Sequence, residues 1–252
     1  AAGPVVLAAG ALGTAHLLLL SDRVRPGGLG NENDLVGRFL MDHPLVDGGD
    51  FVPASPSLID AMALYDLRAV DGRPAMGHLR IARPALSSQG LLQLSAMLFP
   101  RERDHRTRYR LTPRQHRAHR AFFEFRAHRH SGGLRNWARL PQVLLGADGL
   151  WRLAMRDRRG RYPRLGRGGW SSMAQPSAVF GAFQVIHQVE QPPHRENRVS
   201  LEPALDAWGR RSLARHWTWN EADRQAAREA QAFMAAVLAR AGLGEYRIVD
   251  DD

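Results

Sequence analysis

The feature that most constrains the fold is the stretch VVLAAGALGTAHLLLLSD at residues 5–22. Val5–Ala9 is a continuous apolar run that ends at Gly10, and a helix-like stretch follows from Gly13 to Ser21. A continuous apolar run bounded by glycine is typical of a parallel strand that is buried on both faces. The sequence therefore predicts a strand, a tight turn and a helix of an α/β domain.

The turn is similar to a dinucleotide-binding turn, because Ala8-x-Gly10-x-x-Gly13 is the GxGxxG fingerprint with its first glycine replaced. However, the helix is followed by SDRVRPGGLGNEND, which is typical of a loop. No acidic residue follows at the end of a second strand, where it would bind a ribose. We therefore interpret the stretch as the last strand–turn–helix of a domain whose earlier part is expected before residue 1.

The charge of the chain is concentrated in one segment. The net charge is +10, and all 35 basic residues are arginine, which indicates coding bias as well as any binding role. Residues 101–170 hold 19 arginines against five acidic residues, whereas the remainder carries a net charge of −4. Such a segment suits an anionic membrane surface, an acidic electron-acceptor protein or nucleic acid. Nucleic acid is the least favoured partner, because no nucleic-acid-binding motif is present.

Several chemistries are excluded or disfavoured by composition and motifs. The chain has no cysteine, which excludes disulfides, thiolate metal sites and cysteine nucleophiles. His116 and His119 are spaced to share a helix face, but arginines rather than carboxylates surround them, so we predict no metal site. The longest apolar run, Leu17–Leu20, is far too short to cross a bilayer. Both a soluble and a peripheral protein fit, in the cytoplasm or the periplasm.

The chain after residue 46 predicts strands joined by loops and helices, which favours an antiparallel sheet with helices. Thr112 and Asn220 are expected to cap helices that stop at Gly132 and Gly242. The second of these helices would bury Ala226, Ala230, Phe233, Val237 and Ala241. The predicted strands are residues 76–82, 90–99 and 183–190, and a hairpin of residues 198–201 with 212–219.

Three segments together resemble one known family. They are VVLAAGALGTAHLLLLSD, GLGNENDLVGRFLMDHP and VEQPPHRENRVSLEPALDAWGRRSLARHWTW. In this order they resemble the glucose–methanol–choline oxidoreductases, flavoenzymes that oxidise alcohols and sugars. The resemblance covers roughly residues 3–46 and 180–245, and the arginine-rich segment carries little of it.

The resemblance implies an α+β fold with two domains. Residues 1–46 would be the end of an FAD-binding, Rossmann-like α/β domain. Residues 47–245 would be a substrate-binding domain with a mainly antiparallel sheet, helices and an arginine-rich helical segment at 101–170. The chain would then be a fragment of a flavin-dependent oxidoreductase that transfers hydride from an alcohol or sugar to FAD.

The resemblance also implies where the catalytic parts lie. The FAD diphosphate loop would lie upstream and the catalytic histidine downstream, so no catalytic residue is expected within this chain, which alone is expected to be inactive. The alternative is a non-catalytic binding module, derived from such an enzyme, that docks on a membrane or protein partner through its basic segment.

Four residues are candidates for ligand contact. Ala9 and Gly10 would approach the FAD, because small residues let the backbone come close to a ligand; alternatively Gly10 only makes a tight turn. Glu190 and Gln191 end a strand whose alternation places polar side chains on one face. That face would line an alcohol or sugar pocket, or else face solvent.

The Asp42-His43-Pro44 motif also allows two interpretations. It would place an imidazole near the flavin, or make a structural hydrogen bond that fixes the crossing between domains. We prefer the second.

Overall fold

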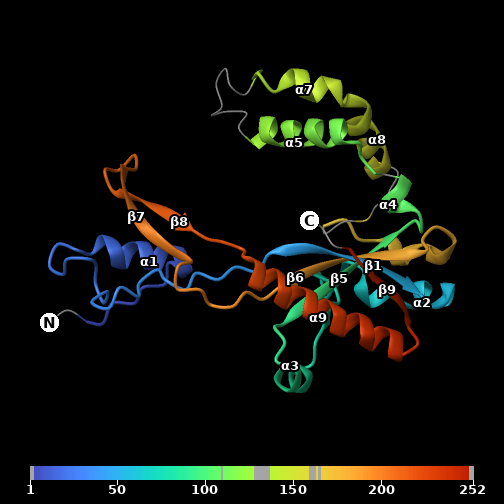
Figure 1. The fold of residues 1–252 in the computed structure, drawn as a ribbon, viewed down its shortest axis with the longest axis horizontal. Coiled ribbons are helices and arrows are strands. Elements are labelled where there is room, and N and C mark those ends of the chain that lie inside the picture. The colour runs from blue at the N-terminus through green and yellow to red at the C-terminus, as the bar shows by residue number, and fades with distance from the viewer. Residues whose placement is uncertain (1–2, 109, 128–136, 159–162, 164–165, 250–252) are drawn as a thin grey trace. The chain divides into compact units, whose positions relative to one another are not determined.

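The computed structural model describes residues 3–108, 110–127, 137–158, 163 and 166–249, and the chain divides into two compact units. Unit 1 comprises Ala1–Leu45, Ile81–Leu94 and Gln188–Ala230, and unit 2 comprises Val46–Arg80, Ser95–His187 and Gln231–Asp252. The described residues form both helices and sheets, as predicted for the α+β class (Figure 1).

A curled five-stranded sheet organises unit 2, with strand order β4-β5-β6-β1-β9 (Figure 1). The outer pairs are antiparallel, with Leu79 opposite Ala96 and Phe51 opposite Tyr246. The predicted antiparallel sheet is therefore confirmed, although the strand expected over residues 76–82 is only two residues long. The strands are β1 (Leu45–Pro53), β4 (Leu79–Arg80), β5 (Leu94–Arg101), β6 (Ala182–Val189) and β9 (Gly244–Ile248).

The alternation predicted for β6 is present. Val185, His187 and Val189 are buried, whereas Gln184 and Ile186 between them are half-buried. Strand side chains alternate between the two faces of a sheet, so one face of β6 packs into the core and the other is partly accessible.

The core of unit 2 is built on β5 and β6 and is closed by a loop. Ala96, Leu98 and Phe183 are fully buried, and Trp170 meets Phe183 edge to face with ring centroids 5.8 Å apart. Asp66, also buried, accepts hydrogen bonds from the backbone N–H of Gly169 and from the N–H and hydroxyl of the following Ser171. Short helices and a hairpin complete this part: α2 (Pro56–Ala61), η1 (Ala63–Tyr65), β2 (Arg68–Val70), β3 (Arg73–Ala75), η2 (Trp170–Ser172) and η3 (Pro176–Ala178).

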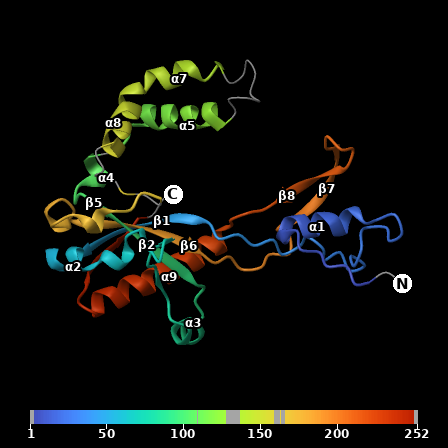
Figure 2. The same cartoon turned by 180° about the vertical axis from the view of Figure 1, so that it is seen from behind.

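Unit 1 contains α1 (Gly10–Leu20), α3 (Arg83–Gln89) and the hairpin of β7 (Arg198–Leu205) with β8 (Arg211–His216). The hairpin has the predicted pairing, with Leu201 opposite Leu213. Figure 2 shows α1 beside β7, and His16 Nε2 of α1 lies 2.8 Å from the Arg211 carbonyl oxygen of β8.

The strand predicted over Val5–Ala9 is wrong. These residues form no strand, and the side chains of Val5 and Val6 are 84% exposed. A strand needs a neighbour for its backbone N–H and C=O groups, and no described strand pairs with this stretch. The helix that follows does form, beginning at Gly10. The Rossmann-like part of the fold stays a prediction.

The described part of the arginine-rich segment contains α4 (His105–Arg108), α5 (Pro113–Ala127), α7 (Leu140–Leu145) and α8 (Ala147–Arg158). Thr112 begins α5: its hydroxyl lies 3.4 Å from the Gln115 N–H, while Gln115 Oε1 accepts from the Thr112 N–H at 2.9 Å. This is a capping box. The predicted stop at Gly132 lies outside the described residues.

The long helix α9 (Glu221–Arg240) begins after Asn220 and is followed by Gly242 at φ 67°, as predicted. Its buried stripe differs from the prediction: Asp223, Ala227, Ala230, Gln231 and Met234 are buried, whereas Val237 and Ala241 are exposed. Asp223, in the first turn of α9, is fully buried, so the buried face of the helix is the one that contains Asp223. No helix of the described residues has both the length and the apolarity that a membrane span requires.

Candidate functional site

Ala9 and Gly10 lie at the start of α1, where the chain turns into the helix. Gly10 has φ 73°, a left-handed value that favours glycine, and both residues are exposed. No other group lies within 4 Å of the position where a Gly10 side chain would begin. The turn therefore requires glycine and leaves room for close approach by a ligand, while contact with FAD stays a prediction.

Glu190 is exposed and held at two points by Gln93. The Glu190 N–H donates to the Gln93 carbonyl oxygen, and Glu190 Oε2 accepts from the Gln93 N–H, each at 2.9 Å. The other carboxylate oxygen, Oε1, bonds no described residue. Glu190 thus has a fixed position and one acceptor oxygen available to a ligand.

Gln191, in contrast, is buried and bonded on all sides by the protein. Its Oε1 accepts from Trp217 Nε1 at 2.8 Å and from the Asp42 N–H at 3.4 Å. Its Nε2 donates to the Thr218 carbonyl oxygen at 2.8 Å and to Asp223 Oδ2 at 3.1 Å. These contacts join Gln191 to Asp42, to the segment of Trp217 and Thr218, and to the start of α9. The geometry therefore indicates that Gln191 holds these segments in position. Its contact with substrate stays a prediction.

The carboxylate of Asp223 is the centre of this network. It is fully buried, and Oδ1 lies 2.7 Å from His194 Nε2 while Oδ2 accepts from the Asn220 N–H at 2.9 Å. Burial raises the pKa of Asp223, but the hydrogen bonds from His194, Asn220 and Gln191 outweigh it and leave the pKa below its usual value. An ionised Asp223 therefore fixes the imidazole of His194, whose Nδ1 bonds no described residue.

Asn197 joins the same network to the hairpin. Its Oδ1 accepts from the N–H of Thr218 at 2.9 Å and from the Thr218 hydroxyl at 3.0 Å. Its backbone carbonyl accepts from the Leu40 N–H, and the Val199 N–H donates to the Gly37 carbonyl, both at 2.8 Å. A side chain on Gly37 would overlap the Val199 carbonyl, so this close approach requires glycine.

The Asp42-His43-Pro44 motif lies against the end of β6. His43 Nδ1 is 2.9 Å from Gln188 Nε2, and the Pro44 carbonyl oxygen accepts from the Val189 N–H at 3.1 Å. These bonds agree with the preferred structural interpretation of the motif. The His43 side chain is otherwise largely exposed.

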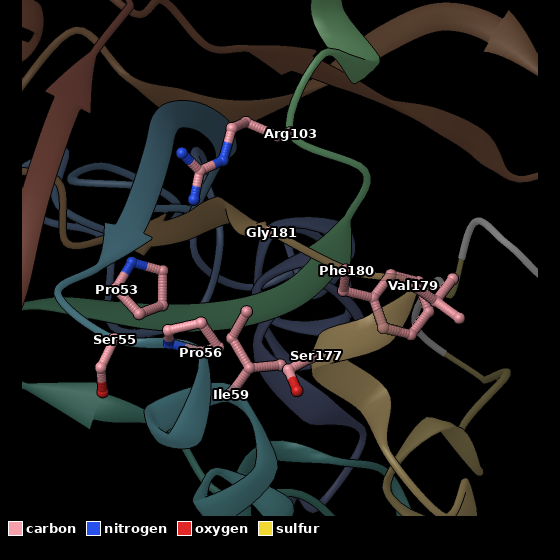
Figure 3. Close-up of a pocket in the computed structure, with 9 residues that line it drawn as sticks. All are labelled: Pro53, Ser55, Pro56, Ile59, Arg103, Ser177, Val179, Phe180 and Gly181. Atoms are coloured by element: carbon pink, nitrogen blue, oxygen red, sulfur yellow. The ribbon is translucent and has the colours of Figure 1, made fainter.

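Unit 2 contains a hollow of about 250 Å³, and none of the four predicted site residues lines it (Figure 3). Arg103 extends over it from the segment after β5 and forms no ion pair with any described residue. Apolar side chains make most of the remaining wall, so the hollow suits a small ligand with an apolar body and an acceptor oxygen. Its lining residues are Pro53, Ser55, Pro56, Ile59, Arg103, Ser177, Val179, Phe180 and Gly181.

A charged cluster in unit 2 ties α4 to β1. Arg106 Nε is 2.6 Å from Asp50 Oδ2, and Arg106 Nη2 is 2.9 Å from Asp47 Oδ1. Burial raises the pKa of Asp47, but the hydrogen bonds from Arg106 and Gln184 and the charge of Arg106 outweigh burial and leave the pKa below its usual value. The pairing fixes the base of the arginine-rich segment on the sheet.

Next to this cluster, the side chain of His187 in β6 is fully buried against Gly48 of β1 and Tyr246 of β9. Its Nε2 is 2.5 Å from the Tyr246 hydroxyl, which donates to the Gly48 carbonyl oxygen at 2.9 Å. Burial lowers the pKa of His187 to about 4, although Asp47 opposes this, and burial raises the pKa of Tyr246. His187 is therefore neutral at pH 7.

Sequence reasoning missed His194, Asp223 and Asn197 as parts of the network. One signal was present, because Asn220-x-x-Asp223 has the spacing of a capping box, in which the Asp223 N–H also donates to Asn220 Oδ1 at 3.0 Å. Nothing in the sequence pattern indicates that His194 and Gln191 meet the same carboxylate. Within the described part of the chain, no group of three or more histidine, aspartate or glutamate side chains is arranged to hold a metal ion.

No protein-family model matches the chain, and a search of curated proteins finds no significant match.

Proposed function

We propose that the chain is part of an FAD-dependent oxidoreductase that oxidises an alcohol or sugar hydroxyl. The proposal rests on the sequence resemblance, and one structural observation carries it further. The segment of residues 34–44 lies along the segment of residues 191–199, joined by Gly37 with Val199, Leu40 with Asn197, and Asp42 with Gln191. These are two of the segments on which the resemblance rests, and they are about 150 residues apart in the chain.

The residues present fit a flavin at one point, the exposed turn at Ala9 and Gly10. Gly10 has a positive φ, which favours glycine, and nothing lies within 4 Å of the position that a Cβ atom would take there. The backbone is therefore open to close approach by a dinucleotide. A bound FAD would supply the hydride acceptor for the carbon that bears the substrate hydroxyl. The chain's own part is to bind, to orient and to exclude water.

Glu190 is the residue proposed to bind substrate. Gln93 fixes one of its carboxylate oxygens and leaves the other available as an acceptor for a sugar or alcohol hydroxyl. The neighbouring Gln191 is anchored by its buried contacts with Thr218 and Asp223, so the acceptor is positioned before the substrate arrives.

The test is dye reduction by the polypeptide that the complete gene encodes. It is expected to reduce an artificial electron acceptor when supplied with members of a panel of alcohols and sugars, with FAD present. Loss of this activity on removing FAD, and its return on adding FAD back, would support the proposal. A purified, folded polypeptide that reduces no acceptor with any of these substrates would overturn it.

A further inference from the structure

Two acidic residues of α5 and α8, Glu124 and Asp148, are bonded to other residues of this three-helix segment. Asp148 Oδ2 accepts from Gln115 Nε2 at 2.6 Å, and Glu124 Oε2 accepts from Arg139 Nε at 3.0 Å. Gly146 lies against Ala118 where α7 meets α8, so closely that a side chain there would overlap it. The helices therefore pack through small residues, and these two carboxylates are hydrogen-bonded where the helices meet.

The arginines of α5 point outward. Arg117, Arg120 and Arg126 are exposed and form no ion pair with any described residue. With 19 arginines against five acidic residues in residues 101–170, the segment carries a net charge of +14. Such a charge attracts an anionic surface.

Large apolar side chains are also exposed on this segment. Leu144 and Leu145 at the end of α7 are 72% and 63% exposed, and Trp151 in α8 is 67% exposed. Ala147 and Ala154, four residues before and three after Trp151, lie on the same helix face and are exposed too. We call Leu144, Leu145 and Trp151 the apolar corner, since they flank the Gly146 turn between the two helices.

We propose that the apolar corner inserts into the interface of an anionic lipid membrane, with the exposed arginines of α5 bound to the lipid headgroups. Tryptophan favours the boundary between headgroups and acyl chains, and exposed leucines gain from burial there. The arginines provide long-range attraction to anionic lipid, which salt screens. This inference does not depend on the flavin proposal.

The combination of exposures favours lipid over an acidic protein. A partner bound only through charge would contact the arginines alone. The tryptophan and leucine side chains would then stay exposed to water in the complex, and their apolar surface would not contribute to binding. A membrane interface accommodates both kinds of group, because apolar side chains enter the acyl region while cationic side chains remain at the headgroups.

The experiment is cosedimentation of the purified chain with vesicles. One set contains phosphatidylcholine alone and the other contains phosphatidylcholine with phosphatidylglycerol. Binding is expected only to the anionic vesicles, and it should weaken as salt rises. In the L144S/L145S/W151A variant, vesicle affinity should fall by about tenfold or more, since interfacial binding scales with buried apolar area.

The matched control is Trp208→Ala, because Trp208 is 78% exposed in the turn of the β7–β8 hairpin, outside the segment. This variant should bind vesicles like the parent chain. Brominated acyl chains should quench tryptophan fluorescence in the parent, and Trp151→Phe should lose most of that quenching.

Three outcomes would overturn the proposal, provided that far-ultraviolet circular dichroism shows the variants to be folded. They are binding to neither anionic vesicles nor an acidic polypeptide, binding to an acidic polypeptide such as polyglutamate but not to anionic vesicles, and vesicle binding that the triple variant does not weaken.

Discussion

His194 Nε2 lies 2.7 Å from Oδ1 of Asp223, a carboxylate that is fully buried while the imidazole remains partly exposed. The same carboxylate accepts from the Asn220 N–H and from Gln191 Nε2. One buried anion thus holds the start of α9 together with Gln191 and His194 of the segment that follows β6. Stability and geometry of this region depend on the same group.

Asp223→Asn should destabilise the chain by about 2–3 kcal/mol. One carboxylate oxygen would be replaced by an amide N–H₂, which cannot accept the hydrogen bonds that the carboxylate now receives from Gln191, His194 and Asn220. The check is the free energy of unfolding from urea titration. Glu221→Gln is the matched control, since Glu221 lies in the same helix turn but on the surface, where ion pairs contribute little. Equal losses in the two variants would contradict the account.

The same variant should change the response to acid. The pKa of Asp223 is below its usual value in the folded chain, because the hydrogen bonds to the carboxylate outweigh its burial. The stability that this group contributes is therefore present above the unfolded pKa of about 4 and is lost as pH falls through the lower folded pKa. The difference in unfolding free energy between the parent and Asp223→Asn should shrink below about pH 4.

His187 predicts a second pH effect at a higher pH. Burial lowers its folded pKa to about 4, against about 6.5 in the unfolded chain. The unfolded chain therefore binds the proton first, so the stability from this group is complete above about pH 6.5 and falls by about 3 kcal/mol toward pH 4. Unfolding free energies measured from pH 7 to pH 4 should show this slope in the parent and a flatter slope in His187→Gln.

Gly48→Ala should be strongly destabilising, by about 3 kcal/mol, through overpacking. The added methyl group would overlap the His187 ring and the Tyr246 hydroxyl, which are both buried in the core of unit 2. Gly3→Ala serves as the control, because nothing lies within 4 Å of its added methyl group. Thermal unfolding of the two variants distinguishes them, and similar midpoints would refute the packing described for Gly48.

Glu190→Ala tests the proposed substrate contact in the complete polypeptide. We expect the KM for the alcohol or sugar to rise about tenfold with a small change in melting temperature, because a hydroxyl would lose one charged acceptor. Glu202→Ala, which removes an exposed carboxylate from β7, should leave KM unchanged. An unchanged KM in Glu190→Ala would remove Glu190 from the proposed site.

Local patterns predicted much of the fold. The alternation of β6, the β7–β8 pairing and the caps at Thr112 and Asn220 follow from short-range rules that act over a few residues. The strand expected over Val5–Ala9 failed because apolar content alone does not supply a hydrogen-bonding neighbour.

The candidate site was less predictable, because its contacts join residues that are far apart in sequence. Gln191 was a candidate for its place at a strand end, yet its burial depends on Trp217 and Asp223, more than 25 residues away. The buried stripe of α9 is shifted by one position from the predicted stripe, because Asp223 points inward to this network. Hydropathy predicts an exposed position for a carboxylate and so does not indicate this burial.

FAD binding and hydride transfer are both tested by the visible absorption spectrum of the polypeptide encoded by the complete gene, purified with FAD. We expect an oxidised flavin spectrum that bleaches in the absence of oxygen when an alcohol or sugar substrate is added. In Glu190→Ala, the spectrum should bleach more slowly or only at a higher substrate concentration. A folded polypeptide that retains no flavin, or whose bound flavin is not reduced by any of these substrates, would contradict it.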